Sequence, residues 1–243
     1  TGGLIGLIDG ATSESSVANT IVSGSIDRQI HTLASSAAPA KTGVIFTALG
    51  GLFGMATTGP LYVQNATVST DISDKFSRVS DLYIGGLCGM EQSDSGAYFS
   101  GITYSGTIST DSSSIQIAAI GGLSGAADIA VSNAEMNVSN SAVTGALLLN
   151  GLDRVDSNGT VYAGGVFGSM DNEGSSLVLN GVAFTGSLAA TGDGRTIVAG
   201  GMAGIVRDTT SANASSPVAS VTADSATVSA PLTVTAREIW TGA

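Results

Sequence analysis

Residues 83–96, "YIGGLCGMEQSDSG", carry the pattern that decides the fold. A glycine pair, an apolar residue, a variable residue and a third glycine form the motif GGLCG, which starts at residue 85. Five relatives of this motif occur along the chain: GGLIG from residue 2, GGLFG from 50, GGLSG from 121, GGVFG from 164 and GGMAG from 200. Successive copies start 48, 35, 36, 43 and 36 residues apart. A period of about 20 to 50 residues is typical of solenoids and repeat arrays.

Segments in which apolar and polar residues alternate lie on both sides of the motif copies. Examples are "SIQIAAI" (114–120), which precedes a glycine pair, and "FSGITYSGTI" (99–108), which follows one. Alternation with many β-branched residues predicts strands, and no convincing amphipathic helix separates them. The sequence therefore predicts an all-β fold, a parallel β-solenoid (β-helix) of about six GGLxG-type repeats of roughly 36 residues, in a single elongated domain over residues 1–243. We expect about two coils per repeat, because Ala, Val and Leu would hardly fill the interior of one 36-residue coil.

The glycine motif itself is expected to be structural. Its third position is apolar in every copy and is predicted to point into the core, beside a tolerant fourth position. Cys88 holds that fourth position, and the nearby charges are acidic rather than basic, so we expect a scaffold residue and not a reactive thiol. A dinucleotide-binding glycine loop would have to open a helix, which no copy does. The glycines are expected to permit tight corners and close backbone contacts.

Composition excludes several classes of function. The net charge is −11 and the sequence pI is about 4.1, so nucleic acids and anionic membranes are disfavoured as partners. No apolar run reaches the roughly 18 residues of a membrane-spanning helix, so membrane insertion is not expected. The one cysteine allows no internal disulfide. An acidic, Ser- and Thr-rich chain of this kind favours an extracellular or cell-surface location.

The repeated GGLxG motif, followed by strands rich in Val and Thr, resembles the GLUG-motif repeats of bacterial secreted and surface proteins. The six copies span residues 2–204, and the fifth and sixth have Val166 and Met202 in place of the leucine. The resemblance implies an adhesin-like β-solenoid architecture. It supplies no catalytic residues to carry over.

Acidic residues follow five of the six motif copies. If these positions line one edge of a solenoid, their oxygens would suit calcium, which binds six to eight oxygen ligands. The calcium candidates are Asp9, Asp94, Asp128, Asp171 and Asp208. The alternative is that they are turn residues that keep the edge soluble. No catalytic residue and no other cofactor is predicted, and His31, the only histidine, is expected to lie in a solvated loop.

The function predicted from these features is a non-enzymatic extracellular structural or adhesive repeat module, with filament formation by self-assembly as part of that hypothesis. A glycan-binding or glycan-cleaving β-helix is the alternative, and it would need Tyr62, Tyr83, Tyr98, Tyr104 and Tyr162 to gather in part on one face. An ice-binding solenoid is a third hypothesis, for which "TVSTD" (67–71) and "TISTD" (107–111) are imperfect hints of Thr-x-Thr ranks. Host or matrix glycans and proteins are candidate ligands.

The ends of the predicted solenoid need partners, because terminal coils leave unpaired strand edges. The chain starts directly on a glycine motif, so we expect either end-to-end self-association or a longer parent chain. Residues 225–243 lack the motif and alternate like a strand. They are predicted to form a terminal cap or a connector strand to a neighbouring subunit, with the connector favoured.

Overall fold

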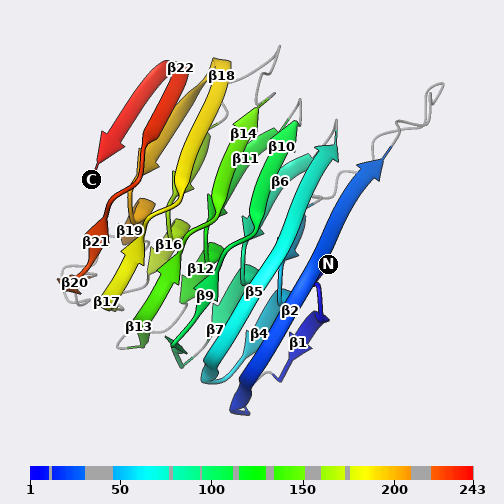
Figure 1. Ribbon diagram of the computed structural model, residues 1–243, viewed down its shortest axis with the longest axis vertical. Coiled ribbons are helices and arrows are strands. Elements are labelled where there is room, and N and C mark those ends of the chain that lie inside the picture. The colour runs from blue at the N-terminus through cyan, green and yellow to red at the C-terminus, as the bar shows by residue number, and fades with distance from the viewer. Residues whose placement is uncertain are drawn as a thin grey trace.

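The computed structural model describes residues 1–10, 13–30, 46–76, 79–93, 95–111, 115–129, 134–150, 160–172, 176–208 and 220–242. Over these residues the chain forms strands, and the strand pairs are parallel. No helix long and apolar enough to cross a membrane occurs in this described part. The all-β parallel solenoid expected from the repeat is therefore present (Figure 1).

Each coil consists of a front layer and a rear layer, and the coils stack side by side from the N-terminal to the C-terminal end (Figure 1). The front layer contains the long strands nearest the viewer. They are β2 (Ser15–Ile30), β5 (Leu61–Phe76), β8 (Ala97–Ser100), β9 (Thr103–Tyr104), β10 (Thr107–Asp111), β13 (Glu135–Val143), β14 (Ala146–Asn150), β17 (Ser176–Phe184), β20 (Ser220–Asp224), β21 (Thr227–Val228) and the first parts of β18 (Ser187–Gly200) and β22 (Leu232–Gly242).

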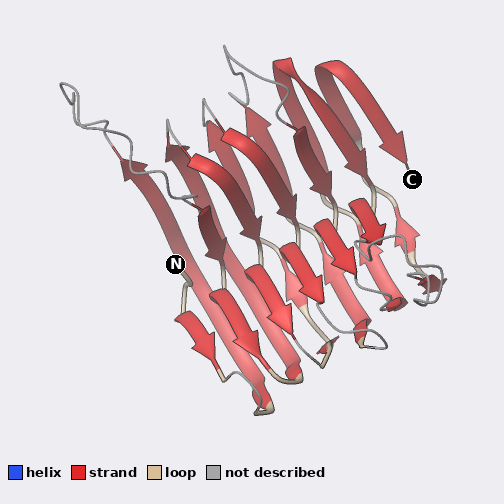
Figure 2. Ribbon diagram, turned by 180° about the vertical axis from the view of Figure 1, so that it is seen from behind, coloured by secondary structure: helices blue, strands red, loops and turns tan. Residues whose placement is uncertain are grey.

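The rear layer has two sets of strands, one on each side of the glycine motif (Figure 2). The pre-glycine strands are β3 (Phe46–Gly50), β6 (Val79–Gly85), β11 (Ile115–Gly121), β15 (Thr160–Gly164) and the last parts of β18 and β22. The post-glycine strands form a six-stranded sheet of β1 (Ile5–Asp9), β4 (Phe53–Thr58), β7 (Cys88–Ser93), β12 (Ser124–Ile129), β16 (Phe167–Asn172) and β19 (Ala203–Asp208).

The register shows one coil per repeat, so the expectation of two coils is wrong. The first glycine of each motif lies beside the first glycine of the next, as in the pairs Gly50–Gly85, Gly85–Gly121 and Gly121–Gly164. The interior is smaller than a round 36-residue coil would enclose, because the coil is flattened into two layers. Aromatic side chains fill the remaining space: Phe53, Phe99, Tyr104, Phe167 and Phe184 are fully buried.

The second glycine of the motif is where the two layers come into contact. A Cβ added to Gly86 would lie 2.2 Å from the carbonyl oxygen of Gly122 on the next coil and 2.4 Å from the ring of Tyr104 in the front layer. No side chain fits between a neighbouring backbone and an aromatic ring at those distances. Glycine is thus required because it lets the rear layer touch the front layer, as a structural role for the motif predicts.

A second corner bends the front layer at one residue per coil. Asn65 and Gly101 have φ values of 52° and 66° and occupy equivalent positions on adjacent coils. Asn140 and Gly181 continue the row with φ values of 46° and 65°. Asn and Gly adopt the left-handed backbone most readily, which explains why they recur at this bend, and Ser225 takes the equivalent position in the last coil with a φ of 54°.

The third motif position points into the core in the inner coils, as predicted. Leu52, Leu87, Leu123 and Val166 are fully buried, whereas Leu4 of the first coil is 58% exposed. The fourth position is not the permissive surface neighbour that strand alternation suggests, because Phe53, Cys88, Ser124 and Phe167 are also fully buried. Both positions face inward since the chain turns a corner between them. Cys88 lies in this environment, and burial raises the pKa of its thiol well above the ordinary value.

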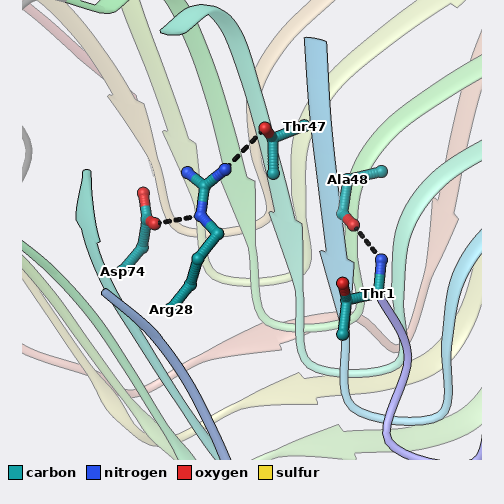
Figure 3. Close-up of polar contacts among 5 residues, drawn as sticks. All are labelled: Thr1, Arg28, Thr47, Ala48 and Asp74. Carbon is teal, nitrogen blue, oxygen red and sulfur yellow. Dashed lines mark hydrogen bonds and ion pairs between the residues drawn. The ribbon is translucent and has the colours of Figure 1, made fainter. Parts of the chain in front are cut away.

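An ion pair joins the front strands of the first two coils, and its arginine also donates a hydrogen bond to the rear layer (Figure 3). Arg28 on β2 donates Nε–H to Asp74 Oδ1 on β5 at 2.6 Å, and the Asp74 side chain is fully buried. The Arg28 Nη1 group also donates to Thr47 Oγ1 on β3 at 2.6 Å, across the interior. The amino group of Thr1 donates to the carbonyl oxygen of Ala48 at 2.8 Å, which attaches the start of the chain to the second coil.

Residues 225–242 continue the last coil. β21 pairs with β17, and β22 pairs with β18 from Leu232 to Gly242, where Gly242 lies beside Gly200. The segment covers the preceding coil, as a cap would. It also presents an outer edge that pairs with no other described strand, as a connector would.

Candidate functional site

The predicted acidic edge is in part a real row on the rear layer. Asp9, Asp128 and Asp171 occupy the same position on their post-glycine strands, in the ladder Asp9–Thr57–Gln92–Asp128–Asp171–Arg207. Asp208 pairs with Asn172 and is thus one position beyond this ladder. Asp94 and His31 lie outside the described residues. Sequence spacing alone thus placed three of the five candidates in line.

The two carboxylates that are adjacent in this ladder are already bound by other side chains. Arg207 donates Nε–H to Asp171 Oδ1 at 2.6 Å and Nη2–H to Oδ2 at 2.8 Å. The hydrogen bond from Arg207 to Asp171 is the main reason that the pKa of the guanidinium is raised. Gln92 donates Nε2–H to Asp128 at 3.2 Å. The ladder therefore neutralises part of its own charge.

Within the described ranges, no three His, Cys, Asp or Glu side chains gather closely enough to hold a metal ion. Asp9 is separated from Asp128 by the coils of Thr57 and Gln92, and Asp171 is held by a bidentate arginine. We expect that millimolar calcium and a chelator give the same melting temperature, since a ligand stabilises a protein only by binding the folded state. A calcium-dependent rise of several degrees that Asp128→Asn removes would contradict this expectation.

The outward faces of the two rear strand sets approach each other across the glycine corner. The Arg207 guanidinium lies over the ring of Tyr162, 5.2 Å from its centroid, although Tyr162 is on a pre-glycine strand and Arg207 on a post-glycine strand. Burial, together with the charges of Asp81, Asp171 and Asp128, raises the pKa of Tyr83 to about 12. Tyr83 is therefore neutral at physiological pH and lies beside a negatively charged ladder.

The tyrosines do not gather on one face. Tyr62 and Tyr98 stack on the front layer, with ring centroids 4.9 Å apart and ring planes 12° from parallel. Tyr83 and Tyr162 lie on the rear layer, and Tyr104 is fully buried. Among the described residues, Tyr62 and Tyr98 are the one stacked aromatic pair that adjacent coils form on the front layer.

Glu91 is a buried acid that the sequence interpretation assigned to a turn. It is fully buried, and neither carboxylate oxygen has a hydrogen-bond partner in the described structure. Burial, and secondarily the charge of Asp128, raises the pKa of Glu91 to about 8. Glu91 belongs to the ladder Ile8–Ala56–Glu91–Ala127–Met170–Val206. The residues that the other five coils contribute to this ladder are all apolar. Aligning the six motif copies on their third position would have exposed this single acid in an apolar column.

The front layer carries a row of hydroxyl groups that the sequence interpretation also missed. One serine or threonine per coil occupies the same outward position, and all six are exposed: Ser23, Ser69, Ser105, Thr144, Thr185 and Ser229. We call this row the hydroxyl ladder. Parallel stacking spaces its members about 4.8 Å apart. From the second coil onward, the neighbouring outward row contains Thr67, Thr103, Ala142, Ala183 and Thr227. The side chains in this part of the front layer are therefore small and uncharged.

The two sequence hints of Thr-x-Thr ranks correspond only partly to this surface. Thr67 and Ser69 point outward, but Thr70 is buried; likewise Ser109 is part-exposed and Thr110 is buried. Thr67 lies beside Thr103 rather than beside Thr107. The regular surface arises from the register between neighbouring coils, which the two five-residue segments by themselves do not show.

Comparison with known proteins gives no assignment, since no protein-family model, no curated protein and no solved structure matches this chain. The likeness of the motif to GLUG repeats stays a prediction from the sequence.

Proposed function

We propose that this chain is a non-enzymatic extracellular structural and adhesive module, whose front layer contacts a polymeric or solid surface. The hydroxyl ladder carries the proposal, because it presents one exposed hydroxyl per coil at a regular spacing of about 4.8 Å. A repeated target, such as a matrix polysaccharide, can meet such a row at many points at once, and many weak contacts give high avidity. The acidic composition and the GLUG-like motif support the extracellular location.

The experiment is a binding assay of residues 1–243 with insoluble polysaccharides and matrix proteins. The test variant is Ser105→Lys with Thr144→Lys, which places two long charged side chains in the middle of the ladder. The matched control is Ile117→Lys, since Ile117 is 40% exposed on the rear layer. We expect the double variant to bind at least about tenfold more weakly, and the control to bind like the wild type.

Binding that the double variant leaves unchanged would contradict the role of the front layer. Release of reducing ends from any polysaccharide in the same samples would contradict the non-enzymatic role. Far-ultraviolet circular dichroism of each variant checks that the substitutions leave the fold intact.

Glycan binding at the Tyr62–Tyr98 pair is a second candidate function. Aromatic rings provide the apolar faces on which sugars pack, and these two rings form a continuous stacked surface on neighbouring coils. Tyr98→Ala is expected to remove glycan binding at this surface while leaving the hydroxyl ladder untouched. A glycan that binds Tyr98→Ala as tightly as the wild type would exclude the pair.

Ice binding is the remaining candidate, and the hydroxyl ladder with its neighbouring row favours it. Outward pairs of hydroxyl groups, Thr67 with Ser69 and Thr103 with Ser105, lie on adjacent coils of the front layer. Inhibition of ice recrystallisation by the wild type, and its loss in the Ser105→Lys, Thr144→Lys variant, would establish this function in place of polymer adhesion.

A further inference from the structure

The first and last coils expose residues that belong to the core of the solenoid. Val221 pairs with the buried Leu177, and Ile239 pairs with the buried Ile197, yet their own exposures are 55% and 45%. Leu4 at the other end is similarly exposed although its equivalents in the inner coils are buried. These residues are exposed because no further coil packs on them in the described structure.

The strand edges at the two ends are also unpaired among the described strands. β2 pairs with β5, and β22 pairs with β18, each along one edge. A parallel edge of this length is a template for another parallel strand. The N- and C-terminal coils lie at opposite ends of the stack, so the two edges face away from each other (Figure 1).

The front strands and the post-glycine strands of the two end surfaces are complementary, because every inner junction joins the same two kinds of strand edge. The core ladders that end at Val206, Val228 and Leu232 begin at Ile8, Val22 and Ile26. One more step along each ladder would therefore bring an apolar residue of one copy against an apolar residue of another. This is the packing that the inner coils already use.

The charges at the ends are complementary as well. The acidic ladder of the rear layer starts at Asp9 and ends at Arg207, which is its only basic member. Continued by a second copy, that ladder would place Asp9 next to Arg207, whose side chain is still 41% exposed. Opposite charges at the edge of an interface favour one orientation of association over others.

We propose that the last coil of one copy binds the first coil of a second copy of this chain, in the register of the internal coils. This inference rests on the proposed structural role. The contact is heterologous, so it joins copies head to tail into an open row. It also covers the exposed core residues at each junction.

Cysteine cross-linking tests both the partner and the register. Ile21 and Thr227 are exposed, occupy the first and last positions of one outward row, and would be about 4.8 Å apart across the proposed junction. That separation lies within the range in which two cysteines form a disulfide. The experiment mixes Ile21→Cys protein with Thr227→Cys protein, each carrying Cys88→Ala, under mild oxidation. We expect a covalent dimer in the mixture and not in either variant alone.

A second cysteine position serves as the control for the register of the cross-link. Replacing Thr227→Cys by Thr233→Cys, which is exposed on the same coil at another position, is expected to abolish cross-linking. A dimer from one variant alone, or equal cross-linking at Thr233, would show a different contact and overturn the proposal. Absence of a dimer in the mixture at millimolar concentration would also overturn it.

Sedimentation gives a readout without cysteines. Asp9→Lys is expected to weaken self-association about tenfold at low salt, because it places two cations together at the junction. Asp111→Lys, an equal charge change at an exposed site of an inner coil, is expected to leave association unchanged. The substitutions of the adhesion variant lie in the inner coils, so surface binding that this variant leaves unchanged, together with intact cross-linking, would reject the adhesive role alone.

Discussion

The Leu123→Asp variant is expected to lose cooperative folding. Leu123 occupies the corner between β11 and β12 and is fully buried. Its backbone is bonded to both neighbouring coils: Leu123 N–H donates to the Val166 carbonyl oxygen at 2.9 Å, and its own carbonyl oxygen accepts from Leu87 N–H at 2.9 Å. A carboxylate at this position would be buried without a partner, which costs several kcal/mol or forces the coil apart. A thermal melt followed by circular dichroism measures the effect.

Two further variants distinguish the cost of burying a charge from the effect of any substitution at the third motif position. Leu123→Ala is expected to fold with a free energy of unfolding lowered by about 2 to 5 kcal/mol, since it removes only buried methyl groups. Leu4→Asp changes the same motif position in the first coil, where the side chain is exposed, and is expected to melt like the wild-type monomer. A cooperative, wild-type-like melt of Leu123→Asp would remove the corner leucines from the core.

The Glu91→Gln variant is expected to be more stable than the wild type at pH 8 and equally stable at pH 4. Burial raises the pKa of Glu91 from its ordinary value of 4.5 to about 8, so the folded state binds a proton that the unfolded state has already released. Stability from this group is thus complete below about pH 4.5 and is lost as the pH rises to about 8. A pKa difference of this size corresponds to about 5 kcal/mol. The expected gain in melting temperature at pH 8 is about 10 °C.

Comparison of the melting temperatures of the wild type and Glu91→Gln across pH separates the contribution of Glu91 from that of other titrating residues. The charge of Asp128 contributes to the raised pKa of Glu91. The charge of Glu91 in turn contributes to the raised pKa of the Cys88 thiol on the same strand. Asp128→Asn is therefore expected to reduce the pH dependence without removing it. Asp111→Asn, at an exposed position, is expected to leave the curve unchanged. Parallel pH profiles of wild type and Glu91→Gln would show that Glu91 is not buried as a neutral acid.

The repeat motif by itself determined the fold class. A recurring GGφxG with alternating segments on both sides predicts stacked parallel strands, because each repeat can bury its apolar face only against the next repeat. The burial of Leu87 and Leu123, and the structural setting of Cys88, follow from the same pattern. The line of Asp9, Asp128 and Asp171 also follows, since a fixed distance from the motif becomes a fixed position on the coil.

The tertiary structure decided the features that depend on contacts between residues far apart in sequence. The number of coils per repeat depended on the close contact of Gly86 with Tyr104, which makes the interior thin enough for one coil to fill. The inward direction of Glu91, the hydroxyl ladder and the meeting of Arg207 with Tyr162 depended on register and on the angle at each corner. Spacing along the chain does not fix either quantity, because insertions of different length between corners leave the stacked positions unchanged. Local sequence thus specifies which residues form strands, and packing between coils specifies which of their side chains meet.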